Sequence, residues 1–225
     1  MMPSVPSHPV CVSLSRLLQA SLALLALLAL GACSLVRPSA TPQPAFYALD
    51  SPPAIAAAAA AALPVAGPTL IVNPPRAAAG FDSQRIIYQR EPYKLEYFAH
   101  SEWVDPPARM LTPLLVAALQ ASGAFRAVVL TAGAASGDLR LDTDIIRLQQ
   151  DFQVQPSSVR FTLRATLVED KTRRVLATRT FEGQVAAASE DPYGGVLAAN
   201  AAVQAVLLDL SRFCAEAVRT LPPAR

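Results

Sequence analysis

The chain has 225 residues, of which 52% are apolar, and its 19 Lys and Arg nearly balance its 17 Asp and Glu. This length predicts one domain with terminal appendages, because domains typically hold about 100–200 residues. The nearly neutral balance gives no basis for nucleic-acid binding, which a basic stripe or patch usually marks.

The first 32 residues have the features of an export signal. They hold one charged side chain, Arg16, followed by the apolar run Leu17–Leu30, which only Gln19 and Ser21 interrupt. A secretory signal combines a basic start, about 7–15 apolar residues and small residues at the cleavage site. The run is shorter than the roughly 20 apolar residues of a spanning helix. We therefore predict a signal peptide over residues 1–32 that is removed after export, leaving no membrane-spanning segment.

The sequence LGAC, Leu30–Cys33, resembles a bacterial lipobox. The resemblance implies cleavage between Ala32 and Cys33, a diacylglyceryl group on the Cys33 sulfur and acylation of the new amino terminus. A thiolate is the nucleophile that the thioether step needs, and two acyl chains already anchor a protein stably. The alternative is an ordinary signal peptide with a chance cysteine. Ser34 stands where an Asp often retains lipoproteins at the inner membrane, so by analogy we expect the outer membrane, on its periplasmic face.

A tether and then a domain follow the anchor. Residues 33–45 are rich in proline and polar residues, without apolar periodicity, which is typical of an extended linker. Its dozen residues could span about 40 Å. The domain, residues 46–225, opens with a short strand in FYALDSPP. Residues 54–68 are rich in alanine and proline, and we expect a loop with fluctuating helix, since a short helix without an amphipathic face is marginal in water.

Further strands are predicted in chain order. TLIVNPP, from Thr69, is one strand, and SQRIIYQ and YKLEYFAH form a hairpin about a turn at Arg90–Tyr93. Four more strands are predicted: FRAVVL, DLRLDTDIIRLQQDFQV, SVRFTLRATLVED and RVLATRTFEGQVAA. In the third of these, Phe161, Leu163, Ala165 and Leu167 alternate with polar residues. This alternation predicts a sheet with one face exposed to water.

Two amphipathic helices complete the predicted fold. The first begins at the N-cap Asp105 and ends at Gly123, and Pro113 either kinks it or marks its true start after Thr112. The second begins at Asp191 and runs to about Thr220. Its predicted core stripe is Val196, Ala199, Val203, Val206, Leu207, Leu210, Phe213 and Cys214. Together these elements predict a two-layer α/β sandwich with a mostly antiparallel or mixed sheet.

Candidate chemistry is sparse. His100 is the one histidine after the leader, near Glu102, and we interpret it as structural or superficial rather than as a catalyst. Asp138, Asp142 and Asp144 lie along one strand, whereas cation sites gather carboxylates in a loop. We interpret them as a solvated face paired with Arg164 or Arg179. We predict no catalytic residue, metal or cofactor, and no phosphate-binding glycine loop is present.

The cysteines do not form a disulfide framework. Cys11 lies in the leader, and if Cys33 is lipidated, Cys214 has no partner within the chain. Because Cys214 falls on the predicted core stripe, we expect an inert buried thiol.

Two candidate binding surfaces remain. Six of the fourteen aromatic residues fall within Phe81–Trp103; they are either core and hairpin packing or a protein-binding surface, since Tyr and Trp are enriched at interfaces. The candidates there are Tyr93, Tyr97 and Trp103. The residues on the back of the last helix are small and apolar. Either this face is exposed to water, where alanine is a good helix former, or another subunit or a partner packs there. This predicted back comprises Ala198, Ala201, Ala202, Ala205 and Leu208, and the candidates for binding are Ala198, Ala201 and Ala205.

The segment Arg85–Val128 resembles the central part of the ABC-type transport auxiliary lipoproteins, the PqiC/YmbA-like family. There a strand pair leads through a Trp-containing segment, here Trp103–Arg109, into an amphipathic helix that ends in Gly and Phe. FYALDSPP and the lipobox stand where that family has them, so the resemblance extends from Leu30 to the C-terminus. The alanine-rich insert, residues 54–67, is longer than usual.

The resemblance implies a role rather than an enzymatic activity. Such lipoproteins accompany an ATPase, a permease and an MCE-type periplasmic substrate-binding protein, and these systems move phospholipids or other hydrophobic compounds between membranes. The chain would be the outer-membrane end, docking the MCE-type protein, and it could form a homo-oligomer. The alternative is a structural or assembly lipoprotein of the envelope. An envelope hydrolase would need a nucleophile and a base that the sequence does not supply.

Overall fold

The computed structural model describes residues 19, 21, 43–50, 67–131 and 137–220. The predicted signal peptide, the lipobox and most of the tether and alanine-rich loop lie outside the described residues, so those predictions stay predictions. All elements below belong to one unit, Gln43–Arg225.

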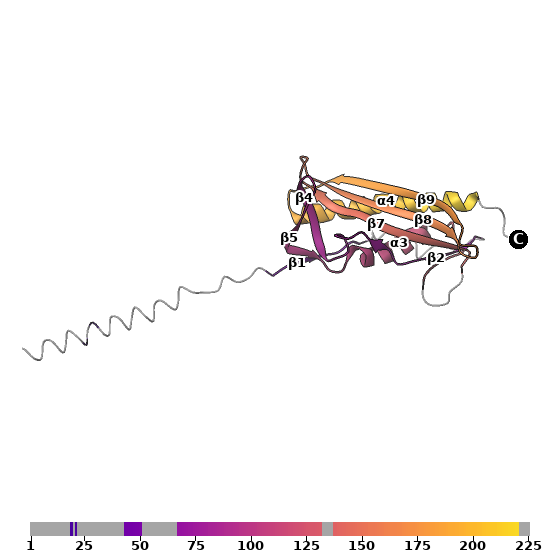
Figure 1. The fold of residues 1–225 in the computed structure, drawn as a ribbon, viewed down its shortest axis with the longest axis horizontal. Helices are drawn as coiled ribbons and strands as arrows, with labels where there is room; N and C mark the ends of the chain where they lie inside the picture. Colours follow the sequence, from indigo (N-terminus) through magenta and orange to yellow (C-terminus); the bar gives the residue numbers. More distant parts are fainter. Residues whose placement is uncertain (1–18, 20, 22–42, 51–66, 132–136, 221–225) are drawn as a thin grey trace, which may run out of the picture. The chain divides into compact units, whose positions relative to one another are not determined.

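Three long antiparallel strands form the main part of the sheet (Figure 1). They are β7 (Leu139–Asp151), β8 (Ser158–Glu169) and β9 (Val175–Ala186). β8 pairs with β7 on one side and with β9 on the other along nearly its whole length. These are the strands with the clearest alternation in the sequence.

Short strands complete the sheet along the other edge of β7. β2 (Thr69–Val72), β3 (Arg76–Ala77) and β4 (Arg85–Glu91) pair with β7 one after another, all in parallel. β6 (Ala127–Leu130) adds to β2 in parallel. β5 (Lys94–Trp103) forms the predicted hairpin with β4. The result is a mixed sheet, as predicted, with β3 as an unpredicted strand.

Two helices cover one face of this sheet, which confirms the two-layer fold. α4 (Pro192–Arg219) packs on β8 and β9, and α3 (Pro107–Ala121) packs beside α4 and β6. Their apolar faces and the strands enclose one continuous core. The predicted stripe of α4 is buried there, with Phe213 half-buried at its end.

β8 shows how the two faces of the sheet differ. Phe161 and Leu163 are fully buried under the helices, whereas Arg160 and Arg164 are exposed on the opposite face. Thr162 lies on that opposite face and is nevertheless buried. It pairs with Arg147 on β7 and Glu182 on β9, so longer side chains flank it on both sides.

The predicted N-cap of the first helix is wrong. α3 begins at Pro107 with Pro106 as its cap residue, which makes no side-chain cap bond, and Asp105 instead pairs with Arg109 at 3.3 Å. The helical region is disfavoured for a residue before a proline, and Pro106, before Pro107, is extended. The helix therefore begins one residue later than a helix capped by Asp105 would. Pro113 lies inside the helix, which therefore does not start after Thr112.

The predicted N-cap of the second helix is confirmed. The Asp191 carboxylate accepts a hydrogen bond from the Gly194 backbone N–H at 2.7 Å and one from the Ser189 hydroxyl at 2.8 Å. The Gly194 N–H first, and the Ser189 hydroxyl second, lower the pKa of this carboxyl. The carboxylate also faces the positive end of the helix dipole.

This cap predicts a pH dependence of stability. Because the folded pKa of Asp191 is below its usual value of about 3.9, its stabilisation is present above that pH and is lost as the pH falls through the folded pKa. Asp191→Asn keeps an acceptor for Gly194 but cannot titrate. We expect its thermal midpoint to lie below wild type at pH 7, with the gap narrowing as the pH falls through the folded pKa, and Asp191→Ala to be lowest at pH 7. A pH-independent gap between Asn and wild type would contradict the assignment.

The amino-terminal strand is fastened to both layers. β1 (Ala45–Tyr47) pairs in parallel with the end of β5, and the Val104 N–H donates to the Tyr47 carbonyl at 2.8 Å. On α4, the Asn200 amide donates to the Ala48 carbonyl at 3.1 Å, and its oxygen accepts from the Asp50 N–H at 2.8 Å. Leu49 is buried between these bonds.

Candidate functional site

The aromatic residues of the hairpin divide into a packed group and an exposed group. Tyr88, Phe98 and Phe152 pack against one another. The ring centroids are 4.5 Å apart for the tilted pair Tyr88 and Phe98, and 5.7 Å apart for the edge-to-face pair Tyr88 and Phe152. Trp103 is 3% exposed and belongs to the core under the helices. Of the two alternatives for the aromatic cluster, core packing holds for Trp103, which is therefore not available for binding; it lies on β5 beyond an irregularity in the pairing with β4 that separates it from Tyr97.

The exposed group stays available for binding. Tyr93, at the hairpin turn, is fully exposed, and Leu95 and Tyr97 on β5 are about half exposed. Leu95 and Tyr97 are two residues apart and so lie on the same side of the strand. The Arg85 guanidinium lies 4.2 Å from the centre of the Tyr97 ring, a cation–π contact that restrains the ring. We call Arg85, Tyr93, Leu95 and Tyr97 the hairpin surface.

The back of α4 differs in part from the prediction. Ala201, Ala205 and Leu208 are exposed, but Ala198 and Ala202 are buried at 3% and 0% exposure. The prediction of Ala198 as a binding residue is wrong because α4 packs against α3 as well as the sheet, which widens its buried arc. The exposed line instead continues towards the amino end of α4 through two residues that the sequence analysis missed. We call Tyr193, Leu197, Ala201, Ala205 and Leu208 the α4 ridge.

The α4 ridge lies on a helix without charge over most of its length. Residues 192–208 contain no Asp, Glu, Lys or Arg. Among the described residues, α4 alone is long and apolar enough to cross a membrane by length and composition, and 61% of that window is buried inside the fold. Burial explains the apolar residues of its inner face. It does not explain those of the ridge, because the solvated face of a helix is normally charged or polar.

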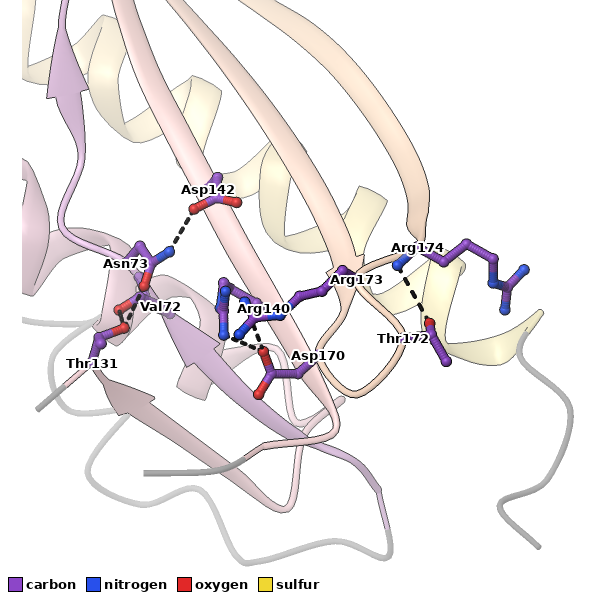
Figure 2. A network of polar contacts seen from close by, with 9 residues as sticks. All are labelled: Val72, Asn73, Thr131, Arg140, Asp142, Asp170, Thr172, Arg173 and Arg174. Atoms are coloured by element: carbon purple, nitrogen blue, oxygen red, sulfur yellow. Dashed lines mark hydrogen bonds and ion pairs between the residues drawn. The ribbon is translucent and has the colours of Figure 1, made fainter. Parts of the chain in front are cut away.

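The acidic residues of β7 are held by neighbouring side chains. Asp144 lies between Arg164 and Arg76, each at 3.0 Å, which confirms the predicted pairing with Arg164. Arg179 instead lies over the Phe181 ring. Figure 2 shows two further carboxylates at the end of the sheet where β2, β6 and β7 meet the turn between β8 and β9.

These two carboxylates of Figure 2 belong to separate contacts. Asp142 accepts a hydrogen bond from the Asn73 amide at 2.6 Å, and Asn73 in turn accepts one from Thr131. Asp170 pairs with Arg140, with Arg173 at 3.7 Å. Within residues 43–50, 67–131 and 137–220, no group of three potential metal ligands occurs. These contacts join neighbouring strands and turns at this end of the sheet.

The family follows from comparison with known proteins. The model of the family "ABC-type transport auxiliary lipoprotein component" matches residues 47–211. The chain belongs to this family. It is a family of transport auxiliary lipoproteins and not one of known enzymes. The match covers both candidate surfaces, the hairpin surface and most of α4. No curated protein matches the chain.

Two solved structures share the fold of this transport auxiliary lipoprotein. The protein XCC0632 from Xanthomonas campestris, of family DUF330, is 26% identical, with a TM-score of 0.65 over 77% of this chain and 96% of its own. A second, uncharacterized protein is 13% identical, with a TM-score of 0.59 over 76% of this chain and 99% of its own. At 13% identity, the similarity to this second protein shows only that the two proteins share a fold.

Two buried polar groups of the lipoprotein, the Cys214 thiol and the Gln150 amide, lie outside these surfaces. Burial raises the pKa of the Cys214 thiol to about 12, so it stays protonated at neutral pH and is a poor nucleophile. The Gln150 side-chain oxygen has no hydrogen-bond partner among the described residues. It borders a cavity of about 10 Å³ beside Trp103 and Gly195, which is the room of a single water molecule. This cavity is far too small for an acyl chain.

His100 also stays outside any catalytic arrangement. Its side chain is exposed on β5, and Asp105, which the sequence places near it, pairs with Arg109. The described residues thus leave two exposed apolar surfaces and, between β9 and the carboxyl-terminal part of α4, an open pocket of about 410 Å³ beside Leu176 and Phe213.

Proposed function

We propose that this chain is the outer-membrane component of an ABC/MCE-type system that moves phospholipids or other hydrophobic compounds between the two membranes of the envelope. The observation that carries the proposal is the family match over residues 47–211. The LGAC sequence supports a lipid anchor at Cys33. In this proposal the tether holds the domain on the periplasmic face of the outer membrane.

In this proposal the domain acts by binding proteins. Its helices and sheet enclose a filled core, and the cavity beside Gln150 has the size of one water molecule. The lipoprotein's part is to hold its partner at the membrane.

The hairpin surface docks the MCE-type periplasmic substrate-binding protein. Tyr is enriched among the residues that dominate interface energies, and Tyr93, Leu95 and Tyr97 project from one hairpin. Because Arg85 already holds the Tyr97 ring at 4.2 Å, less side-chain freedom is lost on binding. The ion pairs of Lys94 with Glu91 and Glu96, at 3.3 and 3.9 Å, give this apolar surface a polar rim.

The test is capture of the partner from detergent-solubilised envelopes with a tagged, full-length chain. We expect the wild type to retain an MCE-type protein with its permease and ATPase, and Tyr93→Glu with Tyr97→Glu to reduce that capture at least tenfold. Val175→Glu is the matched control, because Val175 is equally exposed but lies at the turn between β8 and β9. It should capture as well as wild type.

Two results would count against the proposal in different ways. Undiminished capture by the hairpin variant would show that the partner docks elsewhere. Retention of only envelope-assembly proteins by the wild type would overturn the transport role and support the structural alternative.

A further inference from the structure

β9 is a long strand at the edge of the sheet (Figure 1). It pairs with β8 on one side, and no described strand pairs with it on the other. The strands at the other ends of the sheet, β1 and β6, have three and four residues, whereas β9 has twelve, without proline or lysine. Natural proteins usually shorten or protect such edges, because their unpaired N–H and C=O groups can bind another extended chain. The edge of β9 lacks this protection.

A pocket opens beside the first residues of β9. Near the middle of the strand, α4 lies directly on it, since a Cβ added to Gly183 would come within 2.8 Å of the Ala202 carbonyl oxygen. Beside the start of the strand lies the open pocket of about 410 Å³. Leu176 and Ala177 line this pocket from the strand, and Phe213 lines it from the helix. The edge of β9 therefore borders a partly apolar hollow at one end.

The side chains around this pocket favour a cation with an apolar stem. The Phe213 ring packs edge-on against Phe181, with the ring centroids 5.6 Å apart, which restrains the ring. The exposed Glu216 carboxylate makes no ion pair with any described residue. It lies in the last turn of α4, where the helix dipole adds negative charge. Arg174, which also lines the pocket, is already paired with Glu169 at 3.5 Å.

We propose that the first half of β9 binds an extended segment of another protein that carries a Lys or Arg side chain. The segment adds to the sheet as a further strand and pairs with the open N–H and C=O groups of β9. Every second side chain of the segment faces α4. The Lys or Arg among these lays its methylene stem on Leu176 and Phe213 and brings its charged end to Glu216. The inference is independent of the docking proposed for the hairpin surface.

The same features favour this occupant over three others. A lipid has no row of backbone groups to match the edge of β9. The C-terminal sequence of the chain, Leu221–Arg225, contains Pro222 and Pro223, and proline cannot donate to a strand ladder. A second copy would bring its own β9, in which the one cation, Arg179, is held over the Phe181 ring at 5.2 Å.

Selection from a library of random octapeptides tests the recognition. The full-length lipoprotein in detergent is the bait, and Glu216→Gln is the variant for counter-selection. We expect enrichment of peptides that have one Lys or Arg, a Val, Ile or Thr two positions away on either side, and no Pro. A selected peptide should bind Glu216→Gln at least tenfold more weakly than wild type, as measured by fluorescence anisotropy of the labelled peptide.

Glu182→Gln is the matched control, because it removes the same charge from an exposed residue of β9. Glu182 pairs with Thr162 and so lies on the face of the sheet away from the helices. This variant should bind the selected peptide as wild type does. Equal weakening by the two glutamate variants, enrichment of acidic or proline-rich peptides, or no enrichment at all would overturn the proposal.

Two further measurements separate strand addition from charge attraction alone. Every second residue of an added strand bonds to its neighbour, so N-methylation of one alternate set of the peptide's amides should abolish binding, and of the other set should not. Amide hydrogen exchange in β9 should slow with the peptide, whereas exchange in the hairpin of β4 and β5 should not change. Equal binding of both methylated peptides would overturn the proposal. So would protection of β9 that depends on protein concentration instead of peptide, because a second copy would then cover the edge.

Discussion

Cys33→Ser is expected to leave the chain as an unprocessed, unacylated precursor that is absent from the outer membrane. The hydroxyl of serine cannot replace the thiolate in the thioether step, and cleavage in front of residue 33 depends on that step. Each buried methylene of an anchor contributes about 0.8 kcal/mol, so losing all acyl chains removes the attachment. Intact mass measurement and membrane fractionation would show both effects.

Cys11→Ser is the matched control, because Cys11 lies in the predicted leader. It should mature to the wild-type mass and location. If Cys33→Ser also matures to that mass and stays with the outer membrane, the lipobox interpretation is wrong.

Phe161→Ala is expected to cost about 3–5 kcal/mol of unfolding free energy, as large-to-small core substitutions of Phe do. Phe161 is fully buried at the middle of β8, between the sheet and α4. Since domains are typically stable by about 5–15 kcal/mol, this loss would remove a large fraction of the total stability. Chemical denaturation of the unit from Gln43 onwards would measure the loss.

The neighbouring residue gives the control. Arg160→Ala changes the solvent-facing position next to Phe161 and should stay within about ±0.5 kcal/mol of wild type. Equal losses of unfolding free energy from the two variants would mean that β8 does not have one buried and one solvent-exposed face.

The two Asp-Pro sequences show what local pattern can and cannot predict. Asp191-Pro192 caps α4 as expected. Asp105 is followed by two prolines, and the second of them moves the start of α3 by one residue. The sequence contained this signal, because the helical region is disfavoured for a residue before proline, but the rule is not absolute: Thr112, before Pro113, is helical within α3.

The topology could not be predicted from local pattern. β3 has two residues, too few to show any periodicity. The parallel pairing of β2, β3 and β4 with successive parts of β7 joins segments that are distant in sequence. The hairpin and the three long strands were predictable because their signals, alternation and a turn, are local.

The binding surfaces were predictable only in part for a related reason. A helical wheel drawn from one core stripe assumes that a helix contacts one layer, but α4 contacts both the sheet and α3. Ala198 is therefore buried, and Tyr193 and Leu197 extend the ridge in its place. Composition alone could not separate Trp103 in the core from Tyr97 on the surface, because both are aromatic residues of one strand.

The fastening of β1 has a mechanical consequence for an anchored protein. Any pull on the tether enters the fold at Ala45 and reaches the middle of α4 through the two hydrogen bonds of Asn200. β1 has three residues in the sheet, so it is the weakest element on this line of force. Its release would free residues 45–50 and extend the reach of the tether by about 20 Å, while the three long strands and both helices stay folded. In a protein anchored at Cys33 as proposed, this release would lengthen the connection to the membrane before the domain itself is loaded.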